Sequence, residues 1–436
     1  MRLLARPSGP IRGRIRPPGD KSISHRALIV GALAPGTTDI EGLLEGDDVL
    51  RTAAAMRMFG AGVERTGDRR WRVTGGPWQA PTAPVDFGNS GTGVRLTMGA
   101  GAAFPIAATY TGDASLSRRP MARIFTPLEA MGARCNAQGG GLLPATVHGG
   151  ALKATAYDSP HASAQIKSAV LLAALGADGE TRVSEPAPSR DHTERMLAAF
   201  GARVTSATRA DGRHEIGIVG RPVLQARPVR VPADPSSAAF AAAAALIVAG
   251  SDLTLDDVLL NPLRTGFFDT VAEMGGGIDV IDRRDAGEPV GALCVRYASL
   301  RGVAPPASRS AAMIDEFPIL AALAAFAEGE TVLSGAAELR VKESDRIALM
   351  VEGLRACGVD CEERPDGLVV QGCGARGVRG GAEIRTHGDH RIAMSFLILG
   401  LGAQAPVSVD EAEMIATSFP DFAGFMQSLG ADIVAS

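Results

Sequence analysis

The chain has 436 residues, of which 46% are hydrophobic and only 4% aromatic, and its formal net charge is −4. This length is natural for two domains, and the hydrophobic share is high enough to exclude extensive disorder. The slightly acidic balance argues against non-specific nucleic-acid binding, which needs a broad basic surface. Because aromatic residues are scarce while alanine and glycine are abundant, we expect small aliphatic cores and closely packed helices.

Cysteines and apolar runs indicate the compartment. The five cysteines are Cys135, Cys294, Cys357, Cys361 and Cys373. An odd, scattered set in a long chain favours reduced thiols. The arginine-rich N-terminus is not followed by the apolar segment of a signal peptide, and the longest apolar run, 238–249, is shorter than a membrane span. We therefore expect a cytoplasmic protein that binds neither membranes nor nucleic acids.

The first predicted helix begins within PPGDKSISHRAL at 17–28. Pro-Pro-Gly keeps the chain out of a helix, and either Asp20 or Ser22 could cap the helix that follows. Lys21, Ser22 and Arg26 then lie on its first turns, together with free backbone N–H groups and the positive end of the helix dipole. This helix start is therefore rich in groups that bind anions.

One short sequence pattern recurs six times along the chain. In each copy an apolar helix ends at a glycine and a strand follows, with spacings of roughly 70 to 80 residues. These glycines are Gly60, Gly132, Gly201, Gly275, Gly358 and Gly430. A polar cluster, an apolar helix and a strand lie between successive copies. We predict six βα subdomains, three in each of two domains, with the break within 228–240.

The unusual polar residues open the first helix of each repeat. If these helices pack in parallel, several N-termini meet at one cleft and attract anions, and basic side chains add charge-assisted hydrogen bonds. Besides the first helix, the openings contain Asn89, Gly91, Thr92, Arg95, Ser163, Gln165, Lys167, Ser236, Ser237, Asp315, Glu316, Asp389, His390 and Arg391. The connecting segments add Arg118, Arg119, Arg190, Asp191, His192, Lys342, Glu343 and Arg346.

Two of these clusters also have a simpler interpretation. VKESDR at 341–346 is typical of a solvated helix start, on which Lys342 and Arg346 share a face and Glu343 pairs with Arg346. GDHR, at 388–391, is typical of a helix cap. Neither interpretation explains why the clusters recur in phase with the repeat. Asp315 and Glu343 are the best acid and base candidates.

Other site types receive less support. GNSGTG at 88–93 resembles a phosphate-binding loop, but it lacks the sequence context of a nucleotide site. Three cysteines and two histidines between 357 and 390 match no common zinc spacing, so buried apolar cysteines are favoured. The chain contains neither a Ser-His-Asp arrangement nor a nucleophile elbow. We predict no metal and no cofactor.

In combination, nine stretches resemble the 5-enolpyruvylshikimate-3-phosphate synthases over the whole chain. They are PPGDKSISHRAL, FGNSGTGVRL, SRRPM, SAQIKSAVLLAAL, SRDHTE, MIDEFPIL, RVKESDRI, GDHRIAMSF and TSFPDF. The first, fourth and fifth are similar to the bacterial class II group, several members of which tolerate glyphosate. The resemblance implies an α/β enolpyruvyl transferase fold with two inside-out domains, each of three βαβαββ repeats. Domain 1 would comprise 1–19 and 234–436, domain 2 would comprise 20–233, and the active site would lie in the interdomain cleft.

The resemblance implies transfer of the enolpyruvyl group of phosphoenolpyruvate to the 5-hydroxyl of shikimate 3-phosphate, with release of phosphate. This is a step of the shikimate pathway to chorismate and the aromatic amino acids. It implies a monomer inhibited by glyphosate. The implied residues for shikimate 3-phosphate are Lys21, Ser22, Arg26, Ser163, Ala164, Gln165, Arg190, Asp315 and Lys342. Those for phosphoenolpyruvate are Lys21, Asn89, Gly91, Thr92, Arg119, Gln165, Arg346 and Arg391. The implied catalytic residues are Asp315, Glu343, Lys21 and Lys342.

Two positions differ between members of the family. Many members have a lysine where this chain has Thr417, and some tolerant members have alanine at the position of Gly91. One alternative is the related UDP-N-acetylglucosamine enolpyruvyl transferase, which uses a cysteine on a loop as its acid, whereas we expect Cys135 on a strand. The serine, arginine and glutamine set favours a sugar phosphate. A non-catalytic phosphate-ligand binding protein is a second alternative, but it would not need Asp315 and Glu343.

Overall fold

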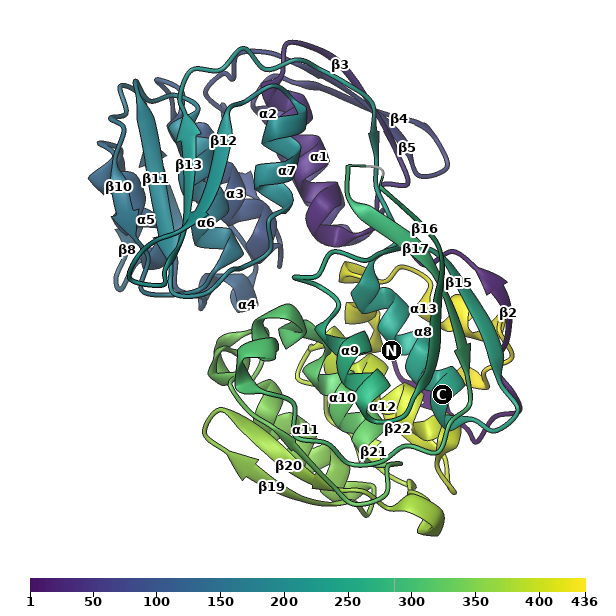
Figure 1. The fold of residues 1–436 in the computed structure, drawn as a ribbon. Coiled ribbons are helices and arrows are strands. Elements are labelled where there is room, and N and C mark those ends of the chain that lie inside the picture. The colour runs from purple at the N-terminus through teal and green to yellow at the C-terminus, as the bar shows by residue number, and fades with distance from the viewer. Residues whose placement is uncertain (286) are drawn as a thin grey trace. The chain divides into compact units, whose positions relative to one another are not determined.

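The computed structural model describes residues 1–285 and 287–436, which form two compact units (Figure 1). Unit 1 comprises Met1–Pro18 and Pro232–Ser436, and unit 2 comprises Gly19–Val231. The division expected from the sequence falls at 19–20 and 233–234. Each unit has its own buried core and is described by itself.

Unit 2 contains seven of the α-helices and twelve of the strands that the structure describes. Its helices are α1 (Lys21–Leu33), α2 (Asp47–Met58), α3 (Gly91–Ala102), α4 (Ala114–Ser117), α5 (Ala122–Ala130), α6 (Ala164–Ala174) and α7 (His192–Ala199). Its strands are β3 (Gly36–Glu41), β4 (Gly62–Gly67), β5 (Arg70–Gly75), β6 (Val85–Asp86), β7 (Ala107–Thr111), β8 (Arg134–Gln138), β9 (Leu142–His148), β10 (Ala156–Asp158), β11 (Glu180–Glu185), β12 (Val204–Thr208), β13 (His214–Val219) and β14 (Val229–Arg230).

Unit 1 contains the remaining described elements. Its α-helices are α8 (Pro235–Ile247), α9 (Gly266–Glu273), α10 (Phe317–Ala324), α11 (Arg346–Ala356), α12 (His390–Gly402) and α13 (Phe422–Gln427). Its strands are β1 (Leu3–Ala5), β2 (Arg12–Ile15), β15 (Asp252–Leu259), β16 (Gly277–Asp285), β17 (Pro289–Arg296), β18 (Glu330–Leu333), β19 (Asp360–Arg364), β20 (Gly367–Gln371), β21 (Glu383–Ile384), β22 (Val407–Val409) and β23 (Ile433–Ala435). Short 3-10 helices include η2 (Ile314–Glu316), η3 (Ala337–Val341) and η5 (Ala412–Thr417).

The three sheets of unit 2 have the same topology. Their strand orders are β14-β3-β5-β4, β6-β7-β9-β8 and β10-β11-β13-β12. In each sheet the first two strands are parallel and the next two pairings are antiparallel, as in β10 with β11, β11 with β13 and β13 with β12. One helix connects the two parallel strands in the second and third sheets, whereas in the first sheet β14 comes from the other end of the unit. In all three sheets a helix precedes the antiparallel hairpin. This is the predicted βαβαββ repeat, present three times.

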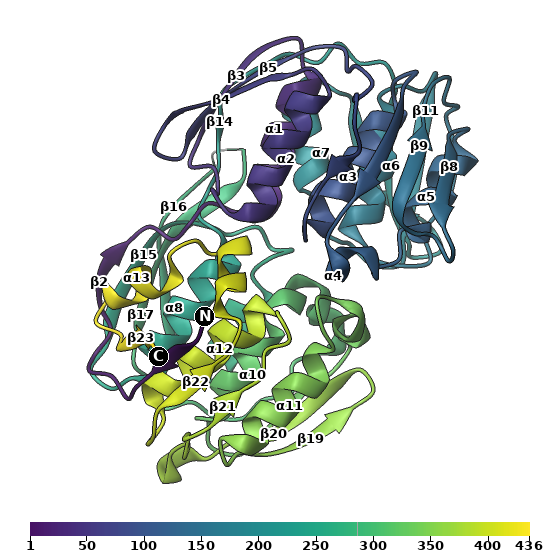
Figure 2. The same cartoon turned by 180° about the vertical axis from the view of Figure 1, so that it is seen from behind.

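Unit 1 repeats this plan with sheets β16-β17-β15-β2, β18-β20-β19 and β21-β22-β1-β23. In the last sheet β1 lies between β22 and β23, so that Leu3 is paired with both Val409 and Ala435. The two chain termini therefore end in one sheet, as Figure 2 shows from behind. Together the six sheets confirm the predicted α/β class with three repeats in each half of the chain.

The first helix of each repeat lies inside its unit, and the sheets lie outside. In unit 2, α1 and α6 both pack against α3, and in unit 1, α8, α10 and α12 pack against one another (Figure 1). Every residue of α8 except its last is buried. Small side chains allow this close approach, as the composition predicted. A Cβ placed on Gly99 of α3 would lie only 2.3 Å from the carbonyl oxygen of Ala169 on α6.

The glycine that ends the second helix of each repeat adopts the predicted left-handed conformation. The φ values of the six glycines named above lie between 81° and 106°. A residue with a side chain is strained at such angles, whereas glycine is not. The sixfold repetition of this local signal explains why the period of the fold is visible in the sequence.

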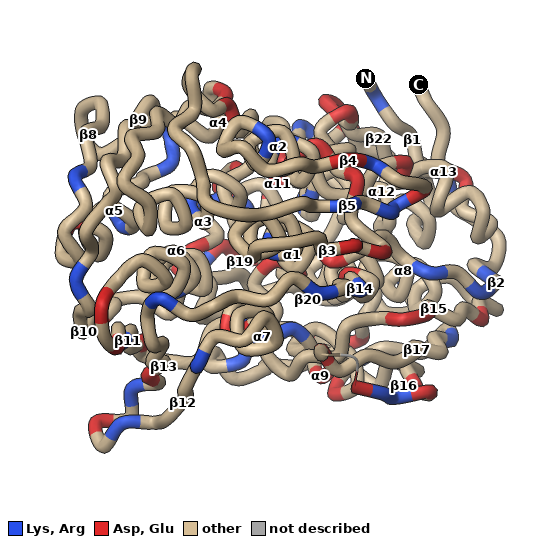
Figure 3. Tube along the Cα trace, turned by 90° about the horizontal axis from the view of Figure 1, so that it is seen from above, with Lys and Arg blue, Asp and Glu red and all other residues tan. Residues whose placement is uncertain are grey.

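The outer surface carries charges of both signs. On the edge strand β16, for example, two adjacent arginines lie between acidic residues (Figure 3). Ion pairs between such exposed side chains typically contribute only about 0–1 kcal/mol to the free energy of unfolding. Among the described residues, no helix is both long and apolar enough to cross a membrane.

We predict that Gly99→Ala destabilises the protein although alanine is the better helix former. Forcing a methyl group into the contact of α3 with Ala169 should cost about 1–3 kcal/mol, which outweighs the roughly 1 kcal/mol gained in helix propensity. Urea unfolding measures the difference in the free energy of unfolding. Gly139→Ala is the control, because a Cβ there meets nothing within 4 Å. Equal stability of Gly99→Ala and the wild type would contradict the proposed close packing of these helices.

Candidate functional site

In unit 2 the candidate residues gather at the starts of the buried helices, beginning with α1. The carboxylate of Asp20 caps this helix by accepting a hydrogen bond from the backbone N–H of Ile23 at 2.7 Å. A Cβ on Gly19 would lie 2.0 Å from the carbonyl oxygen of Gly42, so only glycine fits before the cap. The chain therefore enters α1 along one path, which places Lys21 and Ser22 on the first turn.

The ammonium group of Lys21 is ion-paired with the carboxylate of Asp48 in the first turn of α2. Both side chains are largely buried. Asp48 thus holds the head of Lys21 close to α2. Sequence reasoning missed this carboxylate: its one signal was a pair of acidic residues at a helix start, which is common for dipole reasons alone.

Arg26 is buried and joins three helices through its guanidinium group. It donates to the hydroxyl of Thr193 on α7 at 2.6 Å and to the hydroxyl of Ser168 on α6 at 2.8 Å. A third hydrogen bond, 2.9 Å long, goes to the carbonyl oxygen of Ser22 in its own helix. The starts of α1, α6 and α7 are therefore fixed side by side.

Gln165, on the first turn of α6, is held by two partners on α3. Its carbonyl oxygen accepts from Arg95 at 2.7 Å, and its amide nitrogen donates to the hydroxyl of Thr92 at 3.1 Å. These two contacts fix the orientation of the amide. Arg95 was noticed in the sequence as part of a helix opening, but it was not assigned to the site.

Arg119 and Asn89 lie close to the start of α3. Arg119 donates to the side-chain oxygen of Asn89 and, at 3.1 Å, to the hydroxyl of Ser115. The amide nitrogen of Asn89 donates to Asp113 at 2.9 Å. A Cβ on Gly91 would lie 3.2 Å from Nη1 of Arg119 and 3.3 Å from Nη1 of Arg95. Any side chain at residue 91 would therefore press on two guanidinium groups.

The remaining candidates of unit 2 flank α6 and α7. Ser163 is the N-cap residue of α6, but its hydroxyl does not cap the helix, and Ala164 is the first helical residue. Arg190 is half-buried in the loop between β11 and α7. Contacts among α1, α3, α6 and α7 thus bring together the predicted helix openings of unit 2.

In unit 1 the central candidate is Arg346, whose side chain is only 1% exposed. It pairs with Asp389 (Nε–Oδ2, 2.8 Å) and with Glu343 (Nη2–Oε2, 2.7 Å). The second contact confirms the predicted pairing of Glu343 and Arg346. Burial alone would lower the pKa of Arg346, but the charges of Asp389, Glu343 and Asp315 raise it above its usual value.

Asp389 combines two roles. Its carboxylate caps α12 by accepting from the backbone N–H of Arg391 at 2.9 Å, and it also accepts from the hydroxyl of Ser344 at 2.9 Å. Burial favours its neutral form, but the charge of Arg346 holds the pKa of Asp389 below its usual value. The helix-cap interpretation of GDHR is therefore correct, and the same carboxylate also fixes a buried arginine.

Asp315 lies among three cationic side chains. Its Oδ1 atom is 3.7 Å from Nζ of Lys342 and 3.6 Å from Nη1 of Arg346. Arg391 donates to the backbone carbonyl oxygen of Asp315 at 2.7 Å and also faces Glu316 at 3.7 Å. Five of the candidate residues, Asp315, Lys342, Glu343, Arg346 and Arg391, therefore lie together in unit 1.

One expectation for this segment is wrong. Lys342 and Arg346 do not share a helix face, because η3 ends at Val341 and α11 begins only at Arg346. The carboxylate of Asp345 caps α11 by accepting from Ala348 N–H at 3.0 Å. The solvated interpretation is also wrong for Arg346, which is buried. The chain bends between the two helices, and Lys342 lies in this bend with its ammonium group close to Asp315.

The cysteines fit the favoured apolar interpretation. Cys361 donates its thiol hydrogen to the carbonyl oxygen of Val351 at 3.5 Å, and burial raises the pKa of Cys357 to about 12. Cys135 lies on β8, as expected, and burial raises its pKa to about 12 as well. Thr417 donates its hydroxyl hydrogen to the carbonyl oxygen of Met414 at 2.7 Å.

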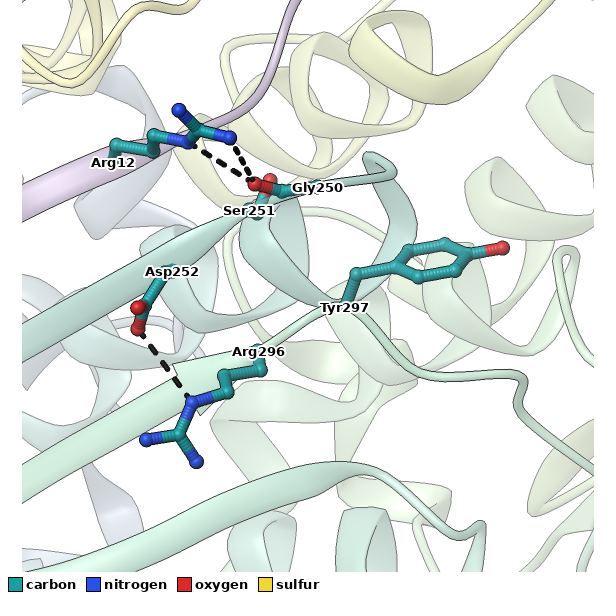
Figure 4. A pocket seen from close by; sticks show the side chains of 6 residues that line it. All are labelled: Arg12, Gly250, Ser251, Asp252, Arg296 and Tyr297. Carbon is teal, nitrogen blue, oxygen red and sulfur yellow. Dashed lines mark hydrogen bonds and ion pairs between the residues drawn. The ribbon is translucent and has the colours of Figure 1, made fainter.

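A separate open cavity of about 610 Å³ in unit 1 contains none of the candidate residues (Figure 4). It is lined by Arg12, Gly250, Ser251, Asp252, Arg296 and Tyr297. Arg12 donates twice to the carbonyl oxygen of Gly250, and Arg296 faces Asp252 at 3.7 Å. None of the predicted site residues lines this cavity, so it lies apart from the candidate site.

Comparison with known proteins identifies the family of the whole chain. The family described as EPSP synthase (3-phosphoshikimate 1-carboxyvinyltransferase) matches residues 5–426. The 3-phosphoshikimate 1-carboxyvinyltransferase of Phenylobacterium zucineum is 56% identical, with 99% of this chain and 95% of that protein covered. The enzyme of the same name from Paracoccus denitrificans is 57% identical, with 99% and 98% covered.

Solved structures give the same result. The EPSP synthase of Acinetobacter baumannii has a TM-score of 0.89 and 43% identity, covering 100% of this chain and 99% of that one. The enolpyruvyl transferase NikO of Streptomyces tendae has a TM-score of 0.79 at 18% identity, covers 100% of this chain and 98% of that one, and shows the fold alone. With repeats, helix openings and full-length relatives in agreement, this chain belongs to the EPSP synthase family.

Proposed function

We propose that this protein transfers the enolpyruvyl group of phosphoenolpyruvate to the 5-hydroxyl of shikimate 3-phosphate and releases inorganic phosphate. The observation that carries the proposal is the match to the family over residues 5–426 together with two groups of cations at buried helix starts. The two substrates bear two phosphates and two carboxylates, which repel one another in solution. Helix N-termini and paired cations supply the opposite charge.

Unit 2 supplies the larger part of the proposed anion-binding surface. For shikimate 3-phosphate we assign Lys21, Ser22, Arg26, Ser163, Ala164, Gln165 and Arg190, with Asp315 and Lys342 from unit 1. For phosphoenolpyruvate we assign Lys21, Asn89, Gly91, Thr92, Arg119 and Gln165, with Arg346 and Arg391 from unit 1. Both groups of residues would then act on one pair of ligands.

Two carboxylates of unit 1 are the proposed proton carriers. Asp315 takes the proton of the 5-hydroxyl as its oxygen adds to C2 of phosphoenolpyruvate, while Glu343 protonates C3. In the second step the C2–O bond to phosphate breaks, Glu343 takes a proton back from C3, and the proton on Asp315 passes to the released phosphate. The neighbouring charges of Lys342 and Arg346 favour the ionised form of Asp315, which is the form that a base needs. Lys21 and Lys342 lie between the ligands and neutralise charge during both steps.

The two alternative functions would need different residues from those proposed here. A transferase acting on UDP-N-acetylglucosamine would need a cysteine acid on a loop, whereas Cys135 lies on β8 with its pKa raised to about 12 by burial. A binding protein without catalysis would not need Asp315 and Glu343 as a base and an acid. We also propose that the protein acts as a cytoplasmic monomer and that glyphosate inhibits it.

We predict that Asp315→Asn and Glu343→Gln each reduce kcat by about 10²- to 10⁴-fold, the usual contribution of a general acid or base. Phosphate release from phosphoenolpyruvate with shikimate 3-phosphate measures turnover, and calorimetry measures binding of shikimate 3-phosphate. Binding should change far less than turnover. Asp252→Asn, in the separate cavity of unit 1, should retain wild-type turnover. Wild-type kcat in both Asp315→Asn and Glu343→Gln would contradict the proposed mechanism.

We predict that Gly91→Ala raises the inhibition constant for glyphosate and also raises KM for phosphoenolpyruvate. The added methyl would lie 3.2 Å from Arg119 and 3.3 Å from Arg95, so at least one guanidinium must shift. If this shift costs about 1.4 kcal/mol of binding free energy, the inhibition constant for glyphosate rises about tenfold. Steady-state kinetics with and without glyphosate give both constants. Gly76→Ala, where a Cβ meets nothing within 4 Å, is the control. An unchanged inhibition constant in Gly91→Ala would refute the prediction.

A further inference from the structure

Lys167 is a buried lysine to which neither the fold nor the proposed chemistry assigns a role. It lies on the first turns of α6, and its side chain is only 1% exposed. Its ammonium group is 2.9 Å from Oε1 of Glu185 and 2.8 Å from Oε1 of Glu194. Removing an ammonium group from water is expensive unless it is paired and hydrogen-bonded. A hydrophobic side chain would fill the same space at lower cost, so the charge requires another explanation.

The partners of Lys167 surround one loop. Glu185 is the last residue of β11, and Glu194 lies in the first turn of α7. Between them, Ser189 is held at three points. Its carbonyl oxygen accepts from Lys167 at 3.0 Å, while its N–H and its hydroxyl donate to Glu185 at 2.8 Å and 2.7 Å. The next residue in the chain is Arg190.

A second set of hydrogen bonds joins the same two helices, α6 and α7. Ser168, next to Lys167 on α6, is 2.7 Å from the hydroxyl of Thr193, which is next to Glu194 on α7. Arg26 donates to both hydroxyls. Lys167 therefore belongs to a buried polar network that joins α6, α7 and the loop before α7.

We infer that Lys167 is a positioning residue for shikimate 3-phosphate binding: through Ser189 and Glu185 it fixes the loop that carries Arg190. The inference rests on the proposed function, which assigns Arg190 to that substrate. Lys167 itself does not contact the ligand. It fixes the backbone from which the Arg190 guanidinium extends, because two carboxylates and one carbonyl oxygen must stay around the buried ammonium group.

The test is a double-mutant cycle between Lys167 and Arg190. Lys167→Met alone would leave two carboxylates facing each other, so we combine it with Glu194→Gln. Burial raises the pKa of Glu194 despite the opposing charge of Lys167, so a neutral side chain suits that site. Calorimetry with shikimate 3-phosphate gives the dissociation constant of the wild type, K167M/E194Q, R190A and the combined triple variant.

We expect the dissociation constant of K167M/E194Q to rise by about 10- to 100-fold, the size expected when a binding group is displaced by about 1 Å. In the R190A background the same two substitutions should add less than a further twofold, because the group that they position is gone. KM for phosphoenolpyruvate at saturating shikimate 3-phosphate should stay within about twofold of the wild-type value. If Lys167 only stabilised the fold, its loss would not change the dissociation constant for shikimate 3-phosphate while leaving KM for phosphoenolpyruvate unchanged.

Two further variants distinguish an effect on this loop from a general loss of structure. Glu185→Gln removes one charge and leaves a balanced pair of Lys167 and Glu194, and we expect a smaller rise of about 3- to 10-fold in the dissociation constant. Ile218→Ala on β13 weakens the core of the same sheet without touching the loop, and should leave the constant unchanged.

Wild-type affinity in both K167M/E194Q and E185Q, with weaker binding in R190A, would overturn the inference and leave the proposed function intact. Effects that multiply in the triple variant would also overturn it. Wild-type affinity in R190A would instead overturn the assignment of Arg190, and with it the inference. If K167M/E194Q does not fold, the E185Q result decides in the same way.

Discussion

A cation removed from water must be surrounded by carboxylates and other oxygen acceptors, and this constraint governs both units. Lys167 in unit 2 and Arg346 in unit 1 are each only 1% exposed. Lys167 pairs with two carboxylates and Arg346 with three, and both cations lie in the first turn of a helix. Such networks fix side chains in place because breaking one contact leaves a buried charge unpaired. Rigid cationic groups at fixed positions are what a site for several anions requires.

The sixfold repeat explains where these groups lie. Each repeat contributes one buried helix, and the first turn of that helix is the place where backbone N–H groups are free. Three such helices pack together in each unit, so three sets of polar side chains come close to one another. Arg26 on α1 contacts Ser168 on α6, and Gln165 on α6 contacts Thr92 on α3. The fold therefore gathers anion-binding groups from distant parts of the sequence.

Local signals were enough to predict the repeat. A glycine such as Gly60 ends a helix because only glycine adopts the left-handed conformation without strain, and this depends on no distant residue. The carboxylate partners were not predictable in this way. Asp48 lies 27 residues from Lys21 in the sequence and Asp389 lies 43 residues from Arg346, and only the packed helices bring them together.

The exact first residue of α11 could not be predicted from the sequence, for a related reason. Ser344 and Asp345 both have side chains that could cap a helix. Ser344 instead donates its hydroxyl hydrogen to Asp389, 45 residues away, which leaves Asp345 as the cap. A tertiary contact thus decided a local choice. The resemblance to a family supplied the residue roles, which composition and spacing alone could not have given.

The measurement that tests the central claim most directly is phosphate release from phosphoenolpyruvate in chelator-treated buffer. Shikimate 3-phosphate and UDP-N-acetylglucosamine are offered in separate reactions, and the organic product is identified by mass spectrometry. We predict release with shikimate 3-phosphate alone, with one enolpyruvyl product formed per phosphate. Release with the nucleotide sugar, or with neither acceptor, would contradict the account of the site given above.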